Sequence, residues 1–372
     1  MDLLKEIAAA RRYPWHPMQP ADTSQASPER KRPQTVGIAI AVVGLIALGG
    51  LWIRLRAERP RLIGHAASFP EGARPASGAW VWLERLKASD VRLIRLGSDR
   101  RAVPIATASA LTDYAADGDA VAWIEKQGGQ WRVQLADAPD RAPRTLWAGA
   151  TEPHGVCLAG DGVYWLAPHA PEAPDCGPLP PFGPSMDLLT APRSGGASHA
   201  VGRLFGAIGG RVLGARDGAI YVAAYRGLGI GSTTFYRVRP GNPAPERLAS
   251  EIGQQRALLA RDGSLYWLAP SREATADAGL CCIRRLAPGG RPETLSDWLP
   301  ARGALFETDR GVRYVDVEEH AGVWPTGAFL EAPRSATAPT GYRYLAVGGD
   351  RVLLCPQNAW LGPTPLYEGP LP

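Results

Sequence analysis

Short apolar runs recur along the chain, each directly behind a pair of turn residues. Residues 262–268 read Asp-Gly-Ser-Leu-Tyr-Trp-Leu, and residues 161–166 read Asp-Gly-Val-Tyr-Trp-Leu. A turn followed by such a run predicts a hairpin that leads into a strand buried on both faces. Units of this kind follow one another at a period of roughly 45 residues. They begin at Ser77, Asp119, Asp161, Asp217, Asp262, Arg310 and Asp350.

The best-defined unit predicts four strands, named a to d in chain order. They are expected at residues 256–260, 265–268, 282–286 and 292–295. Inner strands that lack a polar face predict sheets packed between two neighbours, as in the blades of a β-propeller. The chain is therefore expected to be all-β, with a seven-bladed β-propeller over residues 60–372. Six or eight blades also fit, because the first and sixth units are the least regular.

The last unit ends after its third strand, which is expected at residues 365–368. Its outer strand must come from elsewhere in the chain. Residues 61–65, Arg-Leu-Ile-Gly-His, are the candidate, and this pairing would join the two ends of the ring. Closure removes the open sheet edge that otherwise invites aggregation.

The Tyr-Trp pair of strand b, followed later by Arg and Gly-Gly, resembles the YWTD-type and TolB-like propeller repeats. The pair stands at 164–165 and 266–267, where the Thr-Asp that completes the YWTD motif is absent. The resemblance covers about residues 60–372 and concerns the fold. Propellers of this kind serve mostly as binding platforms, and the resemblance assigns no functional residue here.

Residues 33–55 are expected to form a single transmembrane helix behind a short flexible tail, residues 1–32. No charged residue lies between Pro33 and Ile53, and at ~1.5 Å per residue such a helix crosses a ~30 Å hydrocarbon layer. Basic residues flank both ends, so the charge pattern does not fix the orientation. The short tail has no evident reason to be exported. We therefore place it in the cytoplasm and the propeller in the periplasm or outside the cell.

The composition fits this view and argues against nucleic-acid binding. The chain has 43 Gly and 35 Pro, which supply many turns, and its hydrophobic content of 45% supplies a core. The net charge of +5 is modest and scattered, and the one basic run, residues 30–32, abuts the apolar segment. The five cysteines match no zinc or redox spacing. Cys157 and Cys176 are a possible disulfide.

The longest connections between strands b and c fall in blades 3 to 6, all on one face. They are residues 168–186, 227–234, 271–280 and 318–324. Long loops on one side of a rigid scaffold commonly carry binding sites. We therefore predict a binding or scaffold module for a protein or glycan partner. Tolerated insertions on an unselected surface remain the alternative.

The residues that open strand a lie on the same face and are expected to ring the mouth of the central channel. Beside Glu71 in blade 1, they are Asp113, His154, Arg211, Arg256, Arg302 and Arg343. Arginine binds carboxylate and phosphate groups with its two-pronged guanidinium. The pattern predicts an anionic ligand at the mouth, although half of these side chains could point to solvent.

Signals of catalysis are weak, and the sequence favours a protein that is not an enzyme and needs no cofactor. No G-x-S-x-G, H-E-x-x-H or P-loop motif is present. Asp316, Glu318 and His320 alternate along one stretch and could converge on a metal ion. The alternative function is therefore a propeller enzyme, such as a lactonase-like metal-dependent hydrolase.

Overall fold

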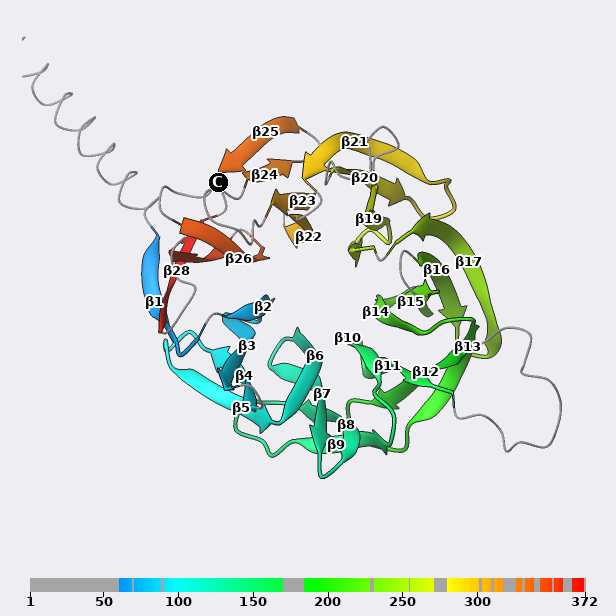
Figure 1. The fold of residues 1–372 in the computed structure, drawn as a ribbon, viewed down its shortest axis with the longest axis horizontal. Helices are drawn as coiled ribbons and strands as arrows, with labels where there is room; N and C mark the ends of the chain where they lie inside the picture. Colours follow the sequence, from blue (N-terminus) through cyan, green and yellow to red (C-terminus); the bar gives the residue numbers. More distant parts are fainter. Residues whose placement is uncertain are drawn as a thin grey trace, which may run out of the picture. The chain divides into compact units, whose positions relative to one another are not determined.

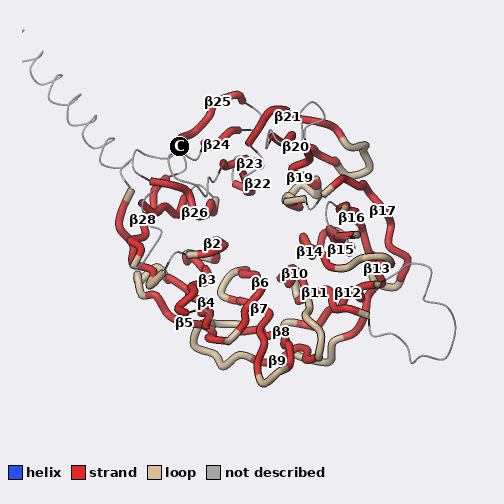
Figure 2. Tube along the Cα trace, in the orientation of Figure 1, coloured by secondary structure: helices blue, strands red, loops and turns tan. Residues whose placement is uncertain are grey.

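The computed structural model shows a ring of antiparallel sheets (Figure 1). The structure describes residues 60–68, 70–87, 90–169, 184–227, 231–253, 255–270, 280–300, 303–308, 311–316, 326–329, 332–337, 342–349, 351–356 and 363–370. Within these residues the regular secondary structure is all strand (Figure 2). The strands form seven four-stranded sheets, which we call blades 1 to 7.

Blades 1 to 4 each consist of four strands that are consecutive in the sequence. Blade 1 holds β2 (Glu71–Ala76), β3 (Ala79–Lys87), β4 (Asp90–Leu96) and β5 (Ala102–Ala108). Blade 2 holds β6 (Ala110–Asp117), β7 (Ala120–Gln127), β8 (Gln130–Ala136) and β9 (Arg144–Gly149). Blade 3 holds β10 (His154–Ala159), β11 (Gly162–Pro168), β12 (Ser185–Pro192) and β13 (His199–Phe205). Blade 4 holds β14 (Gly209–Arg216), β15 (Ala219–Arg226), β16 (Ser232–Arg239) and β17 (Asn242–Ile252).

Blades 5 and 6 repeat this plan, whereas blade 7 combines both ends of the propeller. Blade 5 holds β18 (Ala257–Leu259), β19 (Leu265–Pro270), β20 (Leu280–Leu286) and β21 (Glu293–Pro300). Blade 6 holds β22 (Gly303–Thr308), β23 (Gly311–Asp316), β24 (Thr326–Phe329) and β25 (Ala332–Thr337). Blade 7 holds β26 (Tyr342–Gly348), β27 (Arg351–Pro356), β28 (Thr364–Pro370) and, as its outer strand, β1 (Arg61–Ala66).

The closure expected from the sequence is confirmed. β1 pairs with β28 in antiparallel register, with Arg61 opposite Glu368 and Ala66 opposite Thr364. Leu366 of β28 is fully buried in a cluster that also contains Ile63 of β1. The first and last described strands are therefore joined by backbone hydrogen bonds and by a shared core, so the ring has no open edge at this point.

The second strand of each blade carries the core. One position of this strand holds a large side chain that is at most 1% exposed in all seven blades. Its occupants are Trp82, Trp123, Trp165, Val222, Trp267, Tyr314 and Leu354. Burying a side chain of this size stabilises the fold by about 1.5–3 kcal/mol.

Neighbouring residues of β19 show how the blades are joined. Trp267 packs on Phe235 of blade 4, with ring centroids 5.0 Å apart. Tyr266, the next residue, lies instead in a cluster with Tyr314 of blade 6. Successive side chains of a strand point to opposite faces, so one Tyr-Trp pair contacts both adjacent blades. The recurring pair therefore belongs to the packing between blades.

The predicted membrane anchor, residues 33–55, and the tail, residues 1–32, lie outside the described residues. Among those that the structure describes, no helix is both long and apolar enough to cross a membrane.

Candidate functional site

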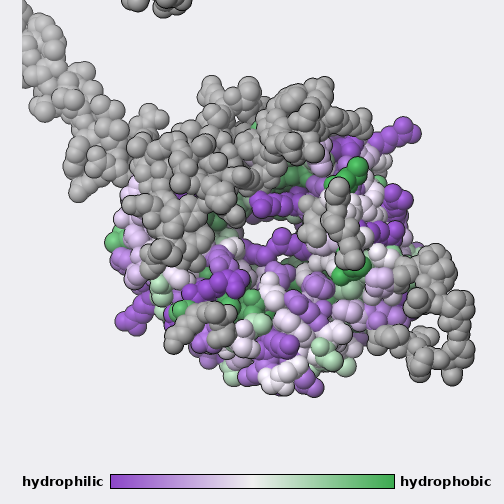
Figure 3. Space-filling view, in the orientation of Figure 1, coloured by the Kyte–Doolittle hydropathy of each residue, from purple (hydrophilic) through white to green (hydrophobic). Residues whose placement is uncertain are grey.

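The first strands of the blades surround a central opening. Figure 3 shows hydrophilic residues around this opening. Because each first strand runs antiparallel to the second, its opening residues lie beside the end of the second strand. His154 of β10 is opposite Leu166, for example, and Arg211 of β14 is opposite Ala223. The strand a openers thus share a face with the connections between strands b and c, as expected.

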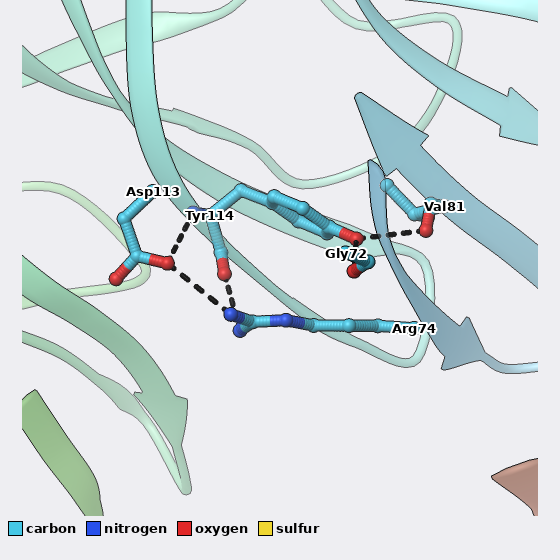
Figure 4. Close-up of polar contacts among 5 residues, drawn as sticks. All are labelled: Gly72, Arg74, Val81, Asp113 and Tyr114. Atoms are coloured by element: carbon cyan, nitrogen blue, oxygen red, sulfur yellow. Dashed lines mark hydrogen bonds and ion pairs between the residues drawn. The ribbon is translucent and has the colours of Figure 1, made fainter. Parts of the chain in front are cut away.

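Arg74 of β2 reaches from blade 1 onto blade 2 (Figure 4). Its guanidinium donates to the Tyr114 carbonyl oxygen and, over 3.2 Å, to Oδ1 of Asp113. The guanidinium carbon also lies 4.7 Å from the centroid of the Tyr114 ring. Each contact lowers the number of orientations open to a long side chain, so Arg74 is held in one position before any ligand arrives.

Tyr114, whose ring packs against this guanidinium, is itself held in place. Its side chain is buried, and its hydroxyl lies 2.5 Å from the Gly72 carbonyl oxygen and 2.8 Å from that of Val81. Burial raises the pKa of Tyr114 well above its usual value, and the charges of Arg74 and Asp113 modify that rise in opposite directions. The phenol therefore stays neutral and acts as a structural tie between blades 1 and 2.

Arg211 of β14 keeps solvent-accessible surface in the channel although protein surrounds it on most sides, and it has no hydrogen bond or ion pair with any described residue. Its pKa is lowered, first by the positive charge of Arg74 and then by burial, while Asp113 acts in the opposite direction. The charge of another cation is thus the main influence on the pKa of Arg211. Two arginines and one aspartate leave this part of the channel with an excess of positive charge.

A close approach of two inner strands places Arg211. A Cβ atom built on Gly155 of β10 would lie 2.5 Å from the Arg211 Cα and 2.8 Å from the Gly210 carbonyl oxygen. Gly155 also has a φ of 64°, which residues with a side chain rarely adopt. Only glycine fits this contact. The absent side chain lets blades 3 and 4 approach each other at the position of Arg211 in β14.

Three further polar side chains lie beside Arg211. Tyr225 is opposite Gly209, two residues before Arg211 on the same strand, so Tyr225 and Arg211 face the same side. A Cβ atom on Gly209 would be 3.9 Å from the Tyr225 ring and 4.0 Å from Nε2 of His154. Burial is the main cause that raises the pKa of Tyr225, and it raises the pKa of Cys157 to about 11. Tyr225 is therefore a neutral hydroxyl donor.

The structure brings three of the predicted site residues together and separates the others. Asp113, His154 and Arg211 lie on the inner strands of three consecutive blades, which contact one another. Glu71 instead pairs with Arg85 of its own blade, over 2.8 Å. Arg343 is buried inside blade 7, where its Nε lies 3.1 Å from the Cys355 sulfur.

The remaining predicted residues are only partly covered by the structure. Arg256 is exposed just before β18, and its carbonyl oxygen accepts a hydrogen bond from the Leu268 amide. Arg302 lies outside the described residues. So do Glu318 and His320 of the possible metal site, whereas Asp316 ends β23. In the part of the chain that is described, no three His, Cys, Asp or Glu residues are grouped so as to hold a metal ion.

The possible disulfide stays a prediction. Cys157 is not in a disulfide in the structure, and Cys176 lies outside the described residues. Most residues of the long connections of blades 3 to 6 also lie outside the described residues. Their ends, however, are described. At the base of the blade 3 connection, His169 Nδ1 lies 2.7 Å from Asp187 Oδ2, and the Arg203 Nε donates to Asp187 Oδ1 over 2.9 Å.

A hollow of about 330 Å³ lies at the turns between the first and second strands, at the opposite end of the blades. Its charged lining residues include Arg261 and Arg351. Here the arginines have carboxylate partners, since Arg261 lies 3.7 Å from Glu307 and Arg351 pairs with Glu368. The excess of positive charge is therefore a property of the Arg74–Arg211 side.

Sequence reasoning missed Arg74, Tyr114 and Tyr225. Arg74 lies three residues after Glu71, the strand opener that the sequence predicts, and a bulge between Glu71 and Arg74 shifts the register of β2. A bulge is not visible in the hydrophobic pattern. Tyr225 lies near the end of β15, a second strand. The small residue opposite it, Gly209, is the only signal that the sequence offers for its position.

Comparison with solved structures agrees with the fold. An oligogalacturonate lyase in complex with manganese is similar at a TM-score of 0.57 and 11% identity, covering 79% of this chain and 86% of the lyase. The propeller domain of the Trilobed protease from Pyrococcus furiosus is similar at 0.54 and 9% identity, over 82% of this chain and 98% of that domain. TolB from Acinetobacter baumannii scores 0.43 at 13% identity, over 77% and 78% of the two chains.

The likenesses to the lyase and to the Pyrococcus domain agree with a β-propeller at the level of the fold. No protein-family model and no curated protein matches the sequence. The Pyrococcus domain is described as having an open velcro topology, whereas here β1 closes blade 7 through β28. At identities this low, the similarity concerns the architecture alone.

Proposed function

We propose that this protein is a membrane-anchored binding module whose propeller holds an anionic ligand in its channel, between Arg74 and Arg211. The single observation that carries the proposal is the state of Arg211. Its guanidinium has no hydrogen-bond or ion-pair partner among the described residues, and the largest influence on its pKa is a second cation. A bound anion would replace this repulsion by attraction to both arginines.

The chemistry of the arginine side chain supports an oxyanion as the ligand. A guanidinium presents five N–H donors in a rigid plane and binds carboxylate or phosphate through paired hydrogen bonds. Arg74 is fixed by Asp113 and Tyr114, so it loses little freedom when a ligand binds. Preorganised donors of this kind favour binding because the cost of ordering them has already been met during folding.

Calorimetric titration of the full-length protein in detergent tests the proposal. The titrants are acetate, phosphate, sulfate and short polyglutamate, and the variants are Arg211→Gln and Arg74→Gln. Arg239→Gln is the matched control, since Arg239 lies in the same blade at the far end of β16. We expect binding that weakens about tenfold or more in each channel variant, as for charged hydrogen bonds worth ~1.5–3 kcal/mol, and that is unchanged in the control. Equal affinity in all four proteins would overturn the proposal.

The partner surface is proposed on the face that carries the connections of blades 3 to 6. The ends of the blade 3 connection are tied together, since the His169 amide donates to the Ser185 carbonyl oxygen over 2.9 Å. A tethered base of this kind presents a loop from a rigid frame. Affinity purification with the full chain, and with a chain whose residues 171–182 are replaced by a Gly-Ser linker, checks it. A protein or glycan retained equally by both chains would contradict this surface.

The anchor and the orientation are part of the same proposal. Residues 33–55 would cross the membrane once and leave the propeller in the periplasm or outside the cell. A C-terminal alkaline phosphatase fusion should then be active, and a C-terminal fusion to a cytoplasmic fluorescent reporter should be dark. The opposite pair of results would place the propeller in the cytoplasm.

A further inference from the structure

The ligand contacts that the channel offers differ in kind between the Arg211 side and the Asp113 side. On the Arg211 side, the polar atoms of Arg211 and the Tyr225 hydroxyl are donors that make no hydrogen bond or ion pair with the described residues. Arg211 and Tyr225 are diagonal neighbours on paired strands, at a separation of about 7–8 Å between backbones that their long side chains can bridge. Together they suit the two oxygens of one carboxylate.

On the Asp113 side, the free group is an acceptor. Asp113 uses a single oxygen, Oδ1, for both of its contacts: the Arg74 guanidinium over 3.2 Å and the Tyr114 amide over 2.9 Å. Figure 4 shows the second oxygen directed away from Arg74. This Oδ2 has no donor within the described part of the chain. A ligand therefore has to supply an O–H or N–H group here if the carboxylate is to keep its hydrogen bonds.

The charge of the site selects among oxyanions. Arg74 and Arg211 supply two positive charges, and Asp113 supplies one negative charge, which pairs with Arg74 and acts electrostatically on Arg211. A monoanion neutralises the remaining positive charge. A dianion such as phosphate would exceed it and would also face the Asp113 carboxylate at close range, where like charges repel.

We infer that the channel binds a hydroxy acid, whose carboxylate lies between Arg211, Tyr225 and Arg74 and whose hydroxyl donates to Asp113 Oδ2. This inference rests on the proposed anion site and names the chemical class of its ligand. The class includes free hydroxy acids and the acidic sugar units of a glycan. In either case the same pair of groups, a carboxylate and a nearby hydroxyl, is recognised.

Matched acids with and without hydroxyl groups test the inference on the full-length protein in detergent. Gluconate is compared with hexanoate, lactate with propionate, and glucuronate attached to a disaccharide is compared with free glucuronate to distinguish glycan from free acid. We expect gluconate and lactate to bind about tenfold more tightly than their counterparts, as for one hydrogen bond to a charged group, and phosphate to bind more weakly than either.

Asp113→Asn sharpens the test because the two classes of acid should respond in opposite directions. Arg74 and Tyr114 would both keep an oxygen at the Oδ1 position, so the amide N–H₂ would occupy the place of Oδ2. The ligand hydroxyl could then only accept a neutral hydrogen bond from this amide, so the preference for the hydroxy acid should fall from about tenfold to about threefold. Hexanoate binding should improve because a negative charge is gone. Tyr225→Phe is the second variant, and it should weaken both acids by the same factor.

The outcomes separate this inference from the proposed function. Wild-type protein that binds gluconate and hexanoate equally, or an Asp113→Asn variant that keeps the full preference, overturns the hydroxy-acid assignment alone, provided that Arg211→Gln still weakens binding about tenfold or more. Tighter binding of phosphate than of gluconate also overturns it. Absence of binding for every acid and for phosphate overturns the anion site itself.

Discussion

The Tyr114 hydroxyl of blade 2 lies 2.5 Å from the Gly72 carbonyl oxygen of blade 1, while the ring of the same residue carries the Arg74 guanidinium. One side chain thus ties two blades together and supports a cation of the channel. The hydroxyl contributes to stability and the ring positions Arg74, so the two roles can be separated by mutation.

Tyr114→Phe removes the hydroxyl and keeps the ring. We expect the free energy of unfolding to fall by ~1–3 kcal/mol, because the buried Val81 carbonyl oxygen loses a donor, and anion affinity to change by less than about threefold. Tyr164→Phe is the control, since Tyr164 is half-buried and its hydroxyl makes no hydrogen bond with a described residue, and it should change stability by less than ~0.5 kcal/mol. Urea unfolding of both variants measures the difference. Equal losses would show that the inter-blade bond is not made.

The closure of the ring predicts a contrast between two leucines of blade 7. Leu366 of β28 is fully buried, whereas Leu62 of β1 is 43% exposed. Leu366→Ala should lower the free energy of unfolding by ~2–5 kcal/mol because it leaves a cavity between the two chain ends. Leu62→Ala should change it by less than ~0.5 kcal/mol. Similar melting temperatures for the two variants would mean that β28 and β1 do not form a shared core.

Two glycines separate backbone strain from close packing. Gly155 and Gly160 both have positive φ, 64° and 54°, but only Gly155 has atoms where a Cβ would lie. Gly160→Ala should cost ~1–2 kcal/mol from strain alone. Gly155→Ala should cost about 1–3 kcal/mol more, from overpacking against Arg211, and should weaken anion binding. If both variants bind anions like the wild type, the close approach of blades 3 and 4 does not position Arg211.

Cys157 predicts a pH dependence with a defined sign. Burial raises its pKa to about 11 in the folded protein, above the ~8.5 of a thiol in an unfolded chain. A raised pKa means that the contribution to stability is fully present below pH ~8.5 and is lost as the pH rises toward 11. In reduced protein, iodoacetamide should therefore label Cys157 slowly at pH 8, and Cys157→Ala should reduce the loss of stability between pH 9 and 11. Peptide mapping measures the labelling, and urea titrations measure the stability. Rapid labelling at pH 8 would refute the raised pKa of Cys157.

The repeat and its closure could be predicted from the sequence because both depend on local patterns. The turn and apolar run at 262–268 and the unfinished last unit fix strand order and the partner of residues 61–65 without any knowledge of side-chain geometry. The site was only partly predictable. Asp113, His154 and Arg211 follow from counting back from each turn, but the same count gave Glu71 in place of Arg74, because the bulge in β2 is invisible to it.

Burial explains the other difference. Arg343 opens its strand as Arg211 does, yet Arg343 is buried beside Cys355 whereas Arg211 is exposed in the channel. The distinction arises from the direction of each side chain and from its neighbours across the sheet. Composition and spacing do not contain this information, so only the structure shows which arginine side chains face the channel.

The central claim is that Arg74 and Arg211 act on the same anion, and a double-mutant cycle in acetate or gluconate affinity tests it most directly. The cycle compares Arg74→Gln, Arg211→Gln and the double variant by calorimetry on the full-length protein. Two cations that share one ligand predict that the double variant loses less affinity than the sum of the single losses, by ~0.5–3 kcal/mol. Losses that add within ~0.3 kcal/mol, or single variants that bind like the wild type, would contradict the account.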